Sequence, residues 1–175
     1  MYNLPQLIMR IDLNTLPPLA LPDGVSVHTH VQGKEKVWED IIEDSFNMHF
    51  DFNFLIKAGN YNPDHVYYLT YNGFDVSTIT AVEKQEYPGE GWLRMLGIKR
   101  TETGKGLGKL TMRVALEKLK ERGYKTAVLS TDDFRIPALC TYLSLGFKPV
   151  YNHESHQSRW EKLKNTLPEK YAKLI

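Results

Sequence analysis

The segment at residues 104–109 reads Gly-Lys-Gly-Leu-Gly-Lys and restricts the fold of this chain more than any other stretch. An apolar run at 92–98, typical of a strand, precedes it, and an amphipathic run at 107–122, typical of a helix, follows it. Glycines allow a backbone to curl until successive N–H groups converge, and the start of a helix adds about half a positive charge. The segment therefore predicts a strand, loop and helix unit whose loop binds phosphate.

Alternating and helical patterns along the rest of the chain predict a single α/β domain over residues 1–175. Asn72-Gly73 lies between two β-rich runs and predicts a hairpin. Prolines in residues 1–24 exclude a regular helix and indicate an extended arm that lies over the domain, and residues 160–175 form a polar tail with some helical character. The expected strands are 25–31, 65–71, 74–82, 92–98, 127–131 and 147–151, and the expected helices are 35–46, 107–122 and 136–145.

Composition indicates a soluble globular protein without a strong net charge. The 22 basic and 21 acidic residues give a formal charge of +1, so neither nucleic acid nor a membrane is an expected partner. The first residues lack the continuous apolar run of a signal peptide, and Cys140 is the single cysteine, which together favour the cytoplasm. His28 and His30 share one face of an expected strand, but no third ligand accompanies them, so no metal is expected.

Two common nucleotide-binding patterns do not fit the glycines. A dinucleotide-binding loop reads G-x-G-x-x-G, whereas this chain reads G-x-G-x-G. A Walker loop needs Ser or Thr after Gly-Lys, but Leu110 follows Lys109 in this chain. A nucleotide-dependent oxidoreductase stays open as an alternative, because Asp132 follows a strand about two dozen residues after the glycines. A glycine turn with a purely geometric role stays open as well.

Two motifs resemble those of the GNAT superfamily of acyl-CoA N-acyltransferases. The family's phosphate loop reads Q/R-x-x-G-x-G/A, and residues 103–108 match it except at the first position. The family's closing helix carries A-x-x-x-Y-x-x-x-G-F, and residues 138–147 fit it at every position. One helix and one strand separate the two motifs, as they do in the family. This sequence departs from the family in having Thr103 in place of Gln or Arg, and Arg135 in place of an Asn often found early in the closing helix.

The resemblance implies a GNAT-like α/β (α+β) fold, with a central mixed, mostly antiparallel sheet and helices on both faces. It also implies acetyl-CoA as co-substrate, with the pantetheine arm held between the strands at 92–98 and 127–131. Backbone groups of Met95 to Ile98 would bind the arm like a neighbouring strand, and the N–H of Leu96 would stabilise the oxyanion. The expected CoA-binding residues are Met95, Leu96, Gly97, Ile98, Thr103, Gly104, Lys105, Gly106, Leu107, Gly108, Lys109 and Arg135.

The resemblance further implies direct attack by an amine, with Tyr142 donating a proton to the leaving thiolate. A primary amine has a pKa near 10.4, so only about one part in a thousand is neutral near pH 7.4, and a base is needed. Glu83 and Glu90 are the nearest carboxylates in sequence, and water held by backbone carbonyls is the alternative. The amine acceptor, a small molecule or a peptide, stays open, as do the acyl chain length and the formation of a homodimer.

Two further hypotheses concern the acceptor and the activity. Several aromatic residues cluster near the expected cleft and would form an apolar acceptor pocket. A non-catalytic module that senses acyl-CoA is a second alternative to the transferase, because Thr103 and the missing base leave turnover open. The aromatic residues are Phe46, Phe50, Phe52, Phe54 and Trp92.

Overall fold

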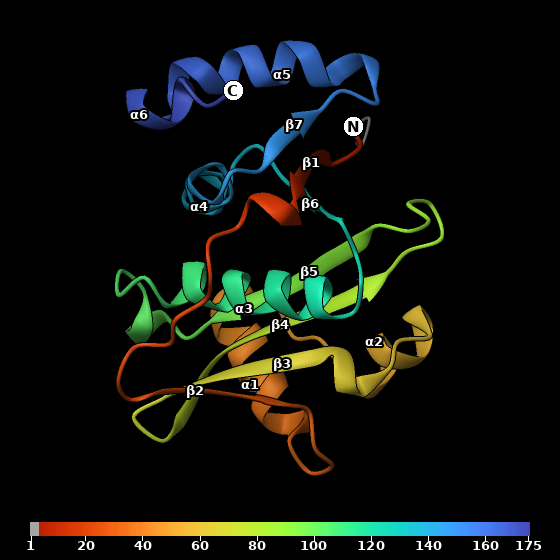
Figure 1. The fold of residues 1–175 in the computed structure, drawn as a ribbon, viewed down its shortest axis with the longest axis vertical. Helices are drawn as coiled ribbons and strands as arrows, with labels where there is room; N and C mark the ends of the chain where they lie inside the picture. Colours follow the sequence, from red (N-terminus) through yellow and green to blue (C-terminus); the bar gives the residue numbers. More distant parts are fainter. Residues whose placement is uncertain (1–3) are drawn as a thin grey trace.

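The computed structural model describes residues 4–175, which form a seven-stranded sheet flanked by helices (Figure 1). The strands are β1 (Leu7–Asp12), β2 (Val25–Thr29), β3 (Val66–Tyr71), β4 (Phe74–Glu83), β5 (Gly91–Ile98), β6 (Thr126–Thr131) and β7 (Lys148–Val150). Their order in the sheet is β2-β3-β4-β5-β6-β1-β7, and all neighbours are antiparallel except β5 and β6, which are parallel. This arrangement confirms the predicted mixed, mostly antiparallel sheet.

Helices form where helical spacing predicts them. The predicted helices at 35–46, 107–122 and 136–145 are all present, and each agrees with its predicted bounds to within one residue. A further helix at 52–59 is not among the predicted ones, and it begins where Asp51 accepts a hydrogen bond of 2.6 Å from the N–H of Phe54. The α-helices are α1 (Glu35–Phe46), α2 (Phe52–Gly59), α3 (Leu107–Glu121), α4 (Ile136–Leu145), α5 (Glu154–Thr166) and α6 (Glu169–Ala172). Within the described residues no helix is both long and apolar enough to cross a membrane.

Residues 7–12 belong to the sheet and not to an arm lying over the domain, which corrects the prediction for residues 1–24. β1 pairs with β6 along its whole length and with β7 on its other side. Leu7, Met9 and Ile11 are buried in the main core, whereas Ile8, which points to the other face, packs beside Val128. The prolines that argue against a helix lie outside the strand, so they limit its length without preventing it. The first three residues of the predicted arm lie outside the described residues.

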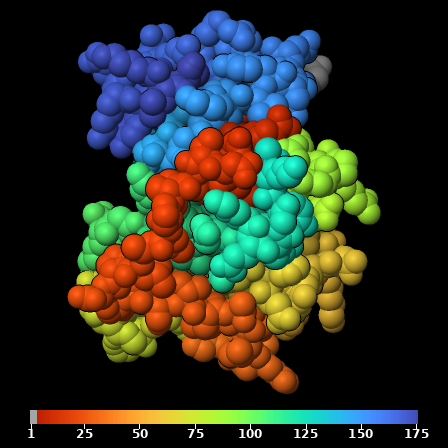
Figure 2. Space-filling model, viewed as in Figure 1, coloured from red at the N-terminus to blue at the C-terminus, as the bar shows by residue number. Residues whose placement is uncertain are grey.

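Beyond β1 the chain does cross the surface in an extended conformation. Residues 16–24 lead from β1 to β2 across α3 (Figure 2). The side chain of Arg113 in α3 donates a hydrogen bond to the carbonyl of Pro17. Leu13 and Leu16 fill the core beside that helix. Only this second part of the predicted arm lies over the domain.

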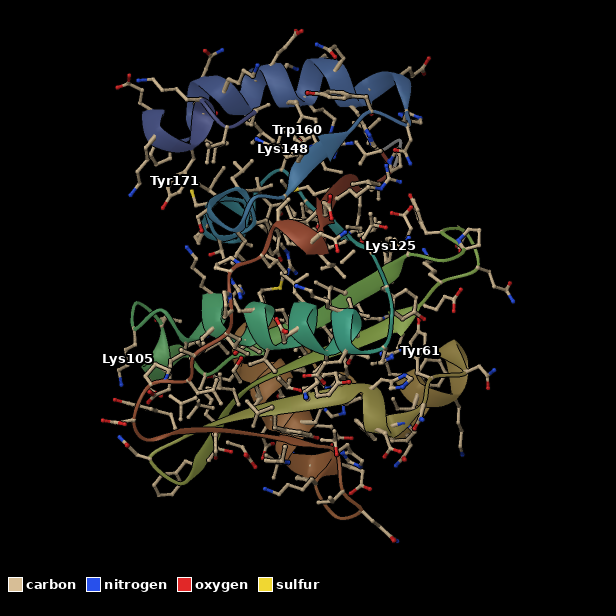
Figure 3. All side chains as sticks on the ribbon, viewed as in Figure 1. Tyr61, Lys105, Lys125, Lys148, Trp160 and Tyr171 are labelled. Atoms are coloured by element: carbon tan, nitrogen blue, oxygen red, sulfur yellow. The ribbon has the colours of Figure 1, made fainter. Side chains whose placement is uncertain are left out.

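The helical character predicted for residues 160–175 is present in α5 and α6, but these residues form a packed layer and not a tail, which corrects that part of the prediction. α5 begins at Glu154, where the side chain of His153 caps the helix. Trp160 and Leu163 are buried, and Trp160 points from α5 toward β7 (Figure 3). A helix of polar average composition therefore packs through a few large apolar side chains.

Helices cover both faces of the sheet (Figure 1). On one face Ile41 and Ile42 of α1 pack with Tyr68 of β3. On the other face Met112 of α3 lies in the large core that contains Tyr67. Because neighbouring residues of a strand point to opposite sides, α1 and α3 lie on opposite faces, as predicted.

The pairing between β5 and β6 stops part of the way along the two strands. Their parallel register extends from Gly91↔Ala127 to Leu93↔Leu129. The remaining residues of β5, at 94–98, have no strand partner on that side. The sheet is therefore open between these two strands, where the resemblance to the family leads us to expect the pantetheine arm.

Candidate active site

The loop before α3 presents backbone N–H groups without partners. Gly104 and Gly106 have φ values of 79° and 78°, a left-handed conformation that costs other residues about 1–2 kcal/mol. The first hydrogen bond of α3 joins the N–H of Leu110 to the carbonyl of Gly106 at 3.1 Å. No described residue accepts a hydrogen bond from the N–H groups that precede it, those of 104–109. A Cβ at Gly104, Gly106 or Gly108 would meet no heavy atom within 4 Å, so open space lies in front of the loop. These properties fit a phosphate group.

The two lysines of the loop differ in their surroundings. Lys109 lines the groove in front of the loop, whereas Lys105 does not. The ammonium of Lys105 lies 2.9 Å from a carboxylate oxygen of Glu102, and this hydrogen bond raises the pKa of Lys105. Figure 3 places Lys105 at the outer edge of the molecule. The positive potential in the groove beside the loop therefore comes from backbone N–H groups, the start of α3 and Lys109.

A groove of about 840 Å³ extends from this loop along α4. Leu96 and Ile98 of β5 form one wall, and Ala138 and Tyr142 of α4 form another. The groove thus follows the open edge of β5. Its lining, from the loop to Tyr142, fits a ligand whose phosphate end lies at the loop and whose other end reaches Tyr142.

A second cavity of about 290 Å³ adjoins the groove. Tyr142 lines both spaces, so its side chain lies at their junction, whereas no residue of the loop 103–109 lines the second cavity. The residues shared by the groove and the cavity are Phe46, Leu96, Arg135 and Tyr142. The polar and aromatic side chains that line only the second cavity include Gln6, Lys84, Trp92, Arg94 and Asp132.

A β-bulge distorts β5 at the wall of the groove. The register pairs Thr80 with Arg94 and Thr78 with Gly97, so one residue of β4 lies opposite two residues of β5. One of these two is Met95, which has a φ of 52°, in the left-handed region that non-glycine residues rarely adopt. Strain of this kind, roughly 1–3 kcal/mol, is typical of functional sites. The bulge lies within the segment predicted to hold the pantetheine arm.

Gly97 packs closely against α1. A Cβ at this position would lie 2.8 Å from the Cδ1 atom of Ile42 in α1. Its carbonyl accepts a hydrogen bond of 2.6 Å from the hydroxyl of Ser77. Within the predicted segment 95–98, this carbonyl is therefore already used by the protein, and the predicted contact with the pantetheine arm falls to the other backbone groups.

Tyr142 has the properties expected of a general acid. Its side chain is only 8% exposed, and burial, opposed by the positive charge of Arg135, raises the pKa of Tyr142 to about 12. No hydrogen bond joins its hydroxyl to another described residue. The group is therefore protonated near neutral pH, and its O–H is free to donate to a ligand at the junction.

Neither carboxylate predicted as the base lines the two spaces around Tyr142. Glu90 accepts hydrogen bonds from Arg10 at 2.7 and 2.8 Å and from Thr126 at 3.0 Å. Burial alone would raise the pKa of Glu90, but these hydrogen bonds outweigh it and hold the pKa below its usual range. Glu83 accepts hydrogen bonds from the hydroxyl of Tyr124 and from a backbone N–H of the turn before β5.

Asp132 is the carboxylate that does line the cavity beside Tyr142. The side-chain amide of Gln6 donates to its oxygens at 3.1 and 3.2 Å, and Arg135 lies 3.6 Å from one of them. The sequence predicts no role in acyl transfer for Asp132 or Gln6. A usable signal is the position of Asp132 at the carboxyl end of a strand that has a parallel neighbour, where ligands commonly bind. Gln6 has no such signal, because it precedes a strand that was not predicted.

The aromatic residues proposed to form an acceptor pocket do not act as a group. Phe46 lines both spaces and Trp92 lines the second cavity. Phe52 is buried beside Trp38, and Phe54 is 73% exposed. The fifth residue of the group, Phe50, packs edge-on against Phe46. Among residues 4–175 there is no group of three or more His, Cys, Asp or Glu side chains arranged to hold a metal ion.

The chain matches the acetyltransferase (GNAT) family over residues 31–147. A mycothiol acetyltransferase of Kytococcus sedentarius is 26% identical over 153 residues, which cover 78% of this chain and 50% of that relative. The chain thus spans about half the length, or less, of the curated relatives it matches.

Solved structures show the same fold. A GCN5-related N-acetyltransferase from Sphaerobacter thermophilus has a TM-score of 0.68 at 23% identity, covering 83% of this chain and 49% of that one. The NatC complex bound to a Gag peptide and CoA has a TM-score of 0.60 at 16% identity, covering 75% of this chain and 92% of that one. β5, α3 and α4, which line the groove, all lie within the residues matched by the family. The chain belongs to the acetyltransferase (GNAT) family.

Proposed function

We propose that this chain binds acetyl-CoA and transfers its acetyl group to a primary amine of a small molecule or peptide. Family membership supports this reaction, and the observation that carries the proposal is the free hydroxyl of Tyr142 at the junction of two spaces. The groove would hold the thioester and the second cavity the amine. The acetyl group would then lie where the two substrates meet.

The residues present fit acetyl-CoA. The N–H groups of 104–109 and the start of α3 would bind the diphosphate, assisted by Lys109. The open edge of β5 beyond Leu93 would pair with the amide groups of the pantetheine arm. The N–H of Leu96 is the donor we propose for the oxyanion. Acetyl-CoA supplies an activated acyl group, so no nucleophile of the protein is needed.

Tyr142 would assist departure of the sulfur. As the amine attacks, the C–N bond forms, the C–S bond breaks, and electron density accumulates on sulfur. The Tyr142 O–H would donate to that sulfur as the bond lengthens. Because its pKa is about 12, Tyr142 stays protonated near neutral pH until negative charge develops on the sulfur.

Removal of the amine proton is the remaining step. Asp132 lies on the cavity wall where the amine would enter, so we propose that it receives this proton directly or through water. The hydrogen bonds from Gln6 hold the carboxylate in place. Glu83 and Glu90 have no part in the proposal, since neither lines the cavity.

Cys140 lies half-buried on α4 without a second cysteine in the chain, which supports a reducing compartment such as the cytoplasm. The proposed chemistry needs one copy of the site, so a homodimer plays no part in it.

The direct test is turnover. The purified chain is incubated with acetyl-CoA and a panel of primary amines, while released thiol and the N-acetylated product are measured together. We expect equal amounts of both. Calorimetric titration with acetyl-CoA and with NAD is run in parallel. Binding of acetyl-CoA without product from any amine would favour the non-catalytic sensing module, and binding of NAD alone would favour the oxidoreductase.

A further inference from the structure

The charged side chains of the second cavity, hereafter the acceptor cavity, are unequal in sign. Lys84, Arg94 and Arg135 line it, and Asp132 is the one acidic residue among the described residues on its walls. Arg135 lies 3.6 Å from Asp132, so these two charges offset each other. Lys84 and Arg94 remain as an excess of positive charge.

Arg94 forms no ion pair within the described part of the chain. Its Nη1 donates to the hydroxyl of Tyr61, and its guanidinium lies 5.1 Å from the centre of the Tyr61 ring. Tyr61 reaches this position from the end of α2 (Figure 3). The Nε atom of Arg94 is buried without a hydrogen-bond partner. A neutral phenol does not neutralise a guanidinium, so an anion in the cavity would complete the environment of Arg94.

Lys84 stands at the same cavity with only a weak partner. Its ammonium lies 4.5 Å from the centre of the Trp92 ring and 3.2 Å from a carboxylate oxygen of Glu86. The side chain of Glu86 is 63% exposed, and an ion pair so open to water contributes little. A carboxylate from a ligand can therefore replace Glu86 at small cost.

The phosphates of CoA do not account for this positive charge. The loop 103–109 lies at the far end of the groove, and none of its residues lines the acceptor cavity. Leu96 of β5 lines both spaces and so lies at their junction. Arg94 precedes Leu96 by two residues, and the loop follows the end of β5, so Arg94 lies on the side of the junction away from the loop. The charge therefore faces whatever enters from the acceptor side.

We infer that the acceptor is an amine that also carries a carboxylate. Arg94 and Lys84 bind the carboxylate, and the amine lies beside Asp132 and Tyr142. This inference rests on the proposed function and names the substrate class for the same site. A charge-assisted hydrogen bond from a guanidinium to a carboxylate gives both affinity and orientation, so it would select among amines of similar size.

The test compares amines that differ only in the group at the far end. ω-Amino acids of increasing chain length are assayed against the corresponding ω-amino amides and α,ω-diamines, following thiol release and product. We expect kcat/KM to be about 10- to 100-fold higher for the best amino acid than for its amide, and the diamine to be the poorest. The wild-type chain thus reports the preference without any substitution.

Variants then assign the preference to residues. Arg94→Met should abolish the preference for the amino acid over its amide. It should lower kcat/KM for the amino acid about 10- to 100-fold and change kcat/KM for the amide less than about 3-fold. Arg94→Lys should restore part of the preference. Lys118→Met is the matched control, because Lys118 pairs with Glu121 on the surface of α3, away from both spaces. Unchanged acetyl-CoA affinity shows that each variant is folded. Should Arg94→Met fail to fold, the smaller loss expected for Lys84→Met, again confined to the amino acid, replaces it.

Two results would overturn the inference in distinguishable ways. Equal or better transfer to the amides or diamines would show that the acceptor carries no carboxylate, while the proposed function would stand. No transfer to any amine in the panel, with acetyl-CoA bound, would overturn the proposed function and this inference with it.

Discussion

The phosphate end of the site consists mainly of backbone groups, whereas the acceptor end consists mainly of side chains. The phosphate loop uses backbone N–H groups of one continuous segment, 104–109, at the start of one helix. The acceptor cavity uses side chains from distant segments, among them Gln6, Lys84 and Asp132. Backbone N–H groups suit a diphosphate that is the same for every acyl-CoA, whereas side chains can differ from one acceptor to the next. The comparison predicts that substitutions at the two ends have separable effects.

Asp132→Asn should have a large effect confined to the acceptor end. The carboxylate lines the cavity beside Tyr142, so its loss removes the proposed proton acceptor and should lower kcat/KM for the amine about 100-fold or more. Acetyl-CoA affinity, measured by calorimetry, should not change. Glu90→Gln serves as the matched control and should keep turnover within about 3-fold, because Glu90 pairs with Arg10 outside the cavity. A larger loss in the control than in Asp132→Asn would reverse the assignment of the base.

Gly106→Ala should have a smaller effect, confined to the phosphate end. Its φ of 78° is strained for alanine, and the added methyl group enters the space in front of the loop. Acetyl-CoA should bind about 10- to 100-fold more weakly, while KM for the amine at saturating acetyl-CoA stays the same.

Gly123→Ala is the matched control for the loop. Gly123 follows α3, has a φ of 91° and also has open space beside it, so it shares the strain without the ligand. Thermal unfolding should show similar destabilisation of about 1–2 kcal/mol in both variants. If both variants lost acetyl-CoA affinity equally, strain alone would explain the loss and the phosphate site would lie elsewhere.

Glu90 gives the smallest predicted effect, on stability and not on turnover. Its folded-state pKa lies below the unfolded value near 4.3, so its contribution is complete above that pH and is lost as the pH falls through the folded pKa. The contribution is about 0.5–1 kcal/mol, since water screens the half-exposed Arg10. Denaturant unfolding of wild type and Glu90→Gln should differ at pH 7 and converge in acid. A constant difference across pH would mean that the ion pair does not stabilise the fold.

The parts of the molecule that could be predicted from sequence are those set by local spacing. Asn72-Gly73 marks the hairpin, Gly146 ends α4 in a left-handed conformation, and the glycines precede α3. In each case a few adjacent residues determine the backbone. The same holds for Tyr142, which the spacing of its motif singles out.

The parts that could not be predicted depend on contacts between distant residues. The prolines around β1 argue for an arm, but pairing with β6 and β7 outweighs them. Residues 160–175 are polar on average, yet Trp160 packs into the main core. The proposed base shows the same limit, because Glu83 and Glu90 are close to the site in sequence whereas Asp132 is close in space.

Turnover of Tyr142→Phe tests the account most directly, because the variant removes one oxygen atom at the junction and leaves the ring in place. We expect kcat to fall about 10²- to 10⁴-fold while acetyl-CoA affinity is unchanged. Turnover equal to wild type, in a variant that still binds acetyl-CoA, would show that the hydroxyl does not assist departure of the sulfur and would contradict the account.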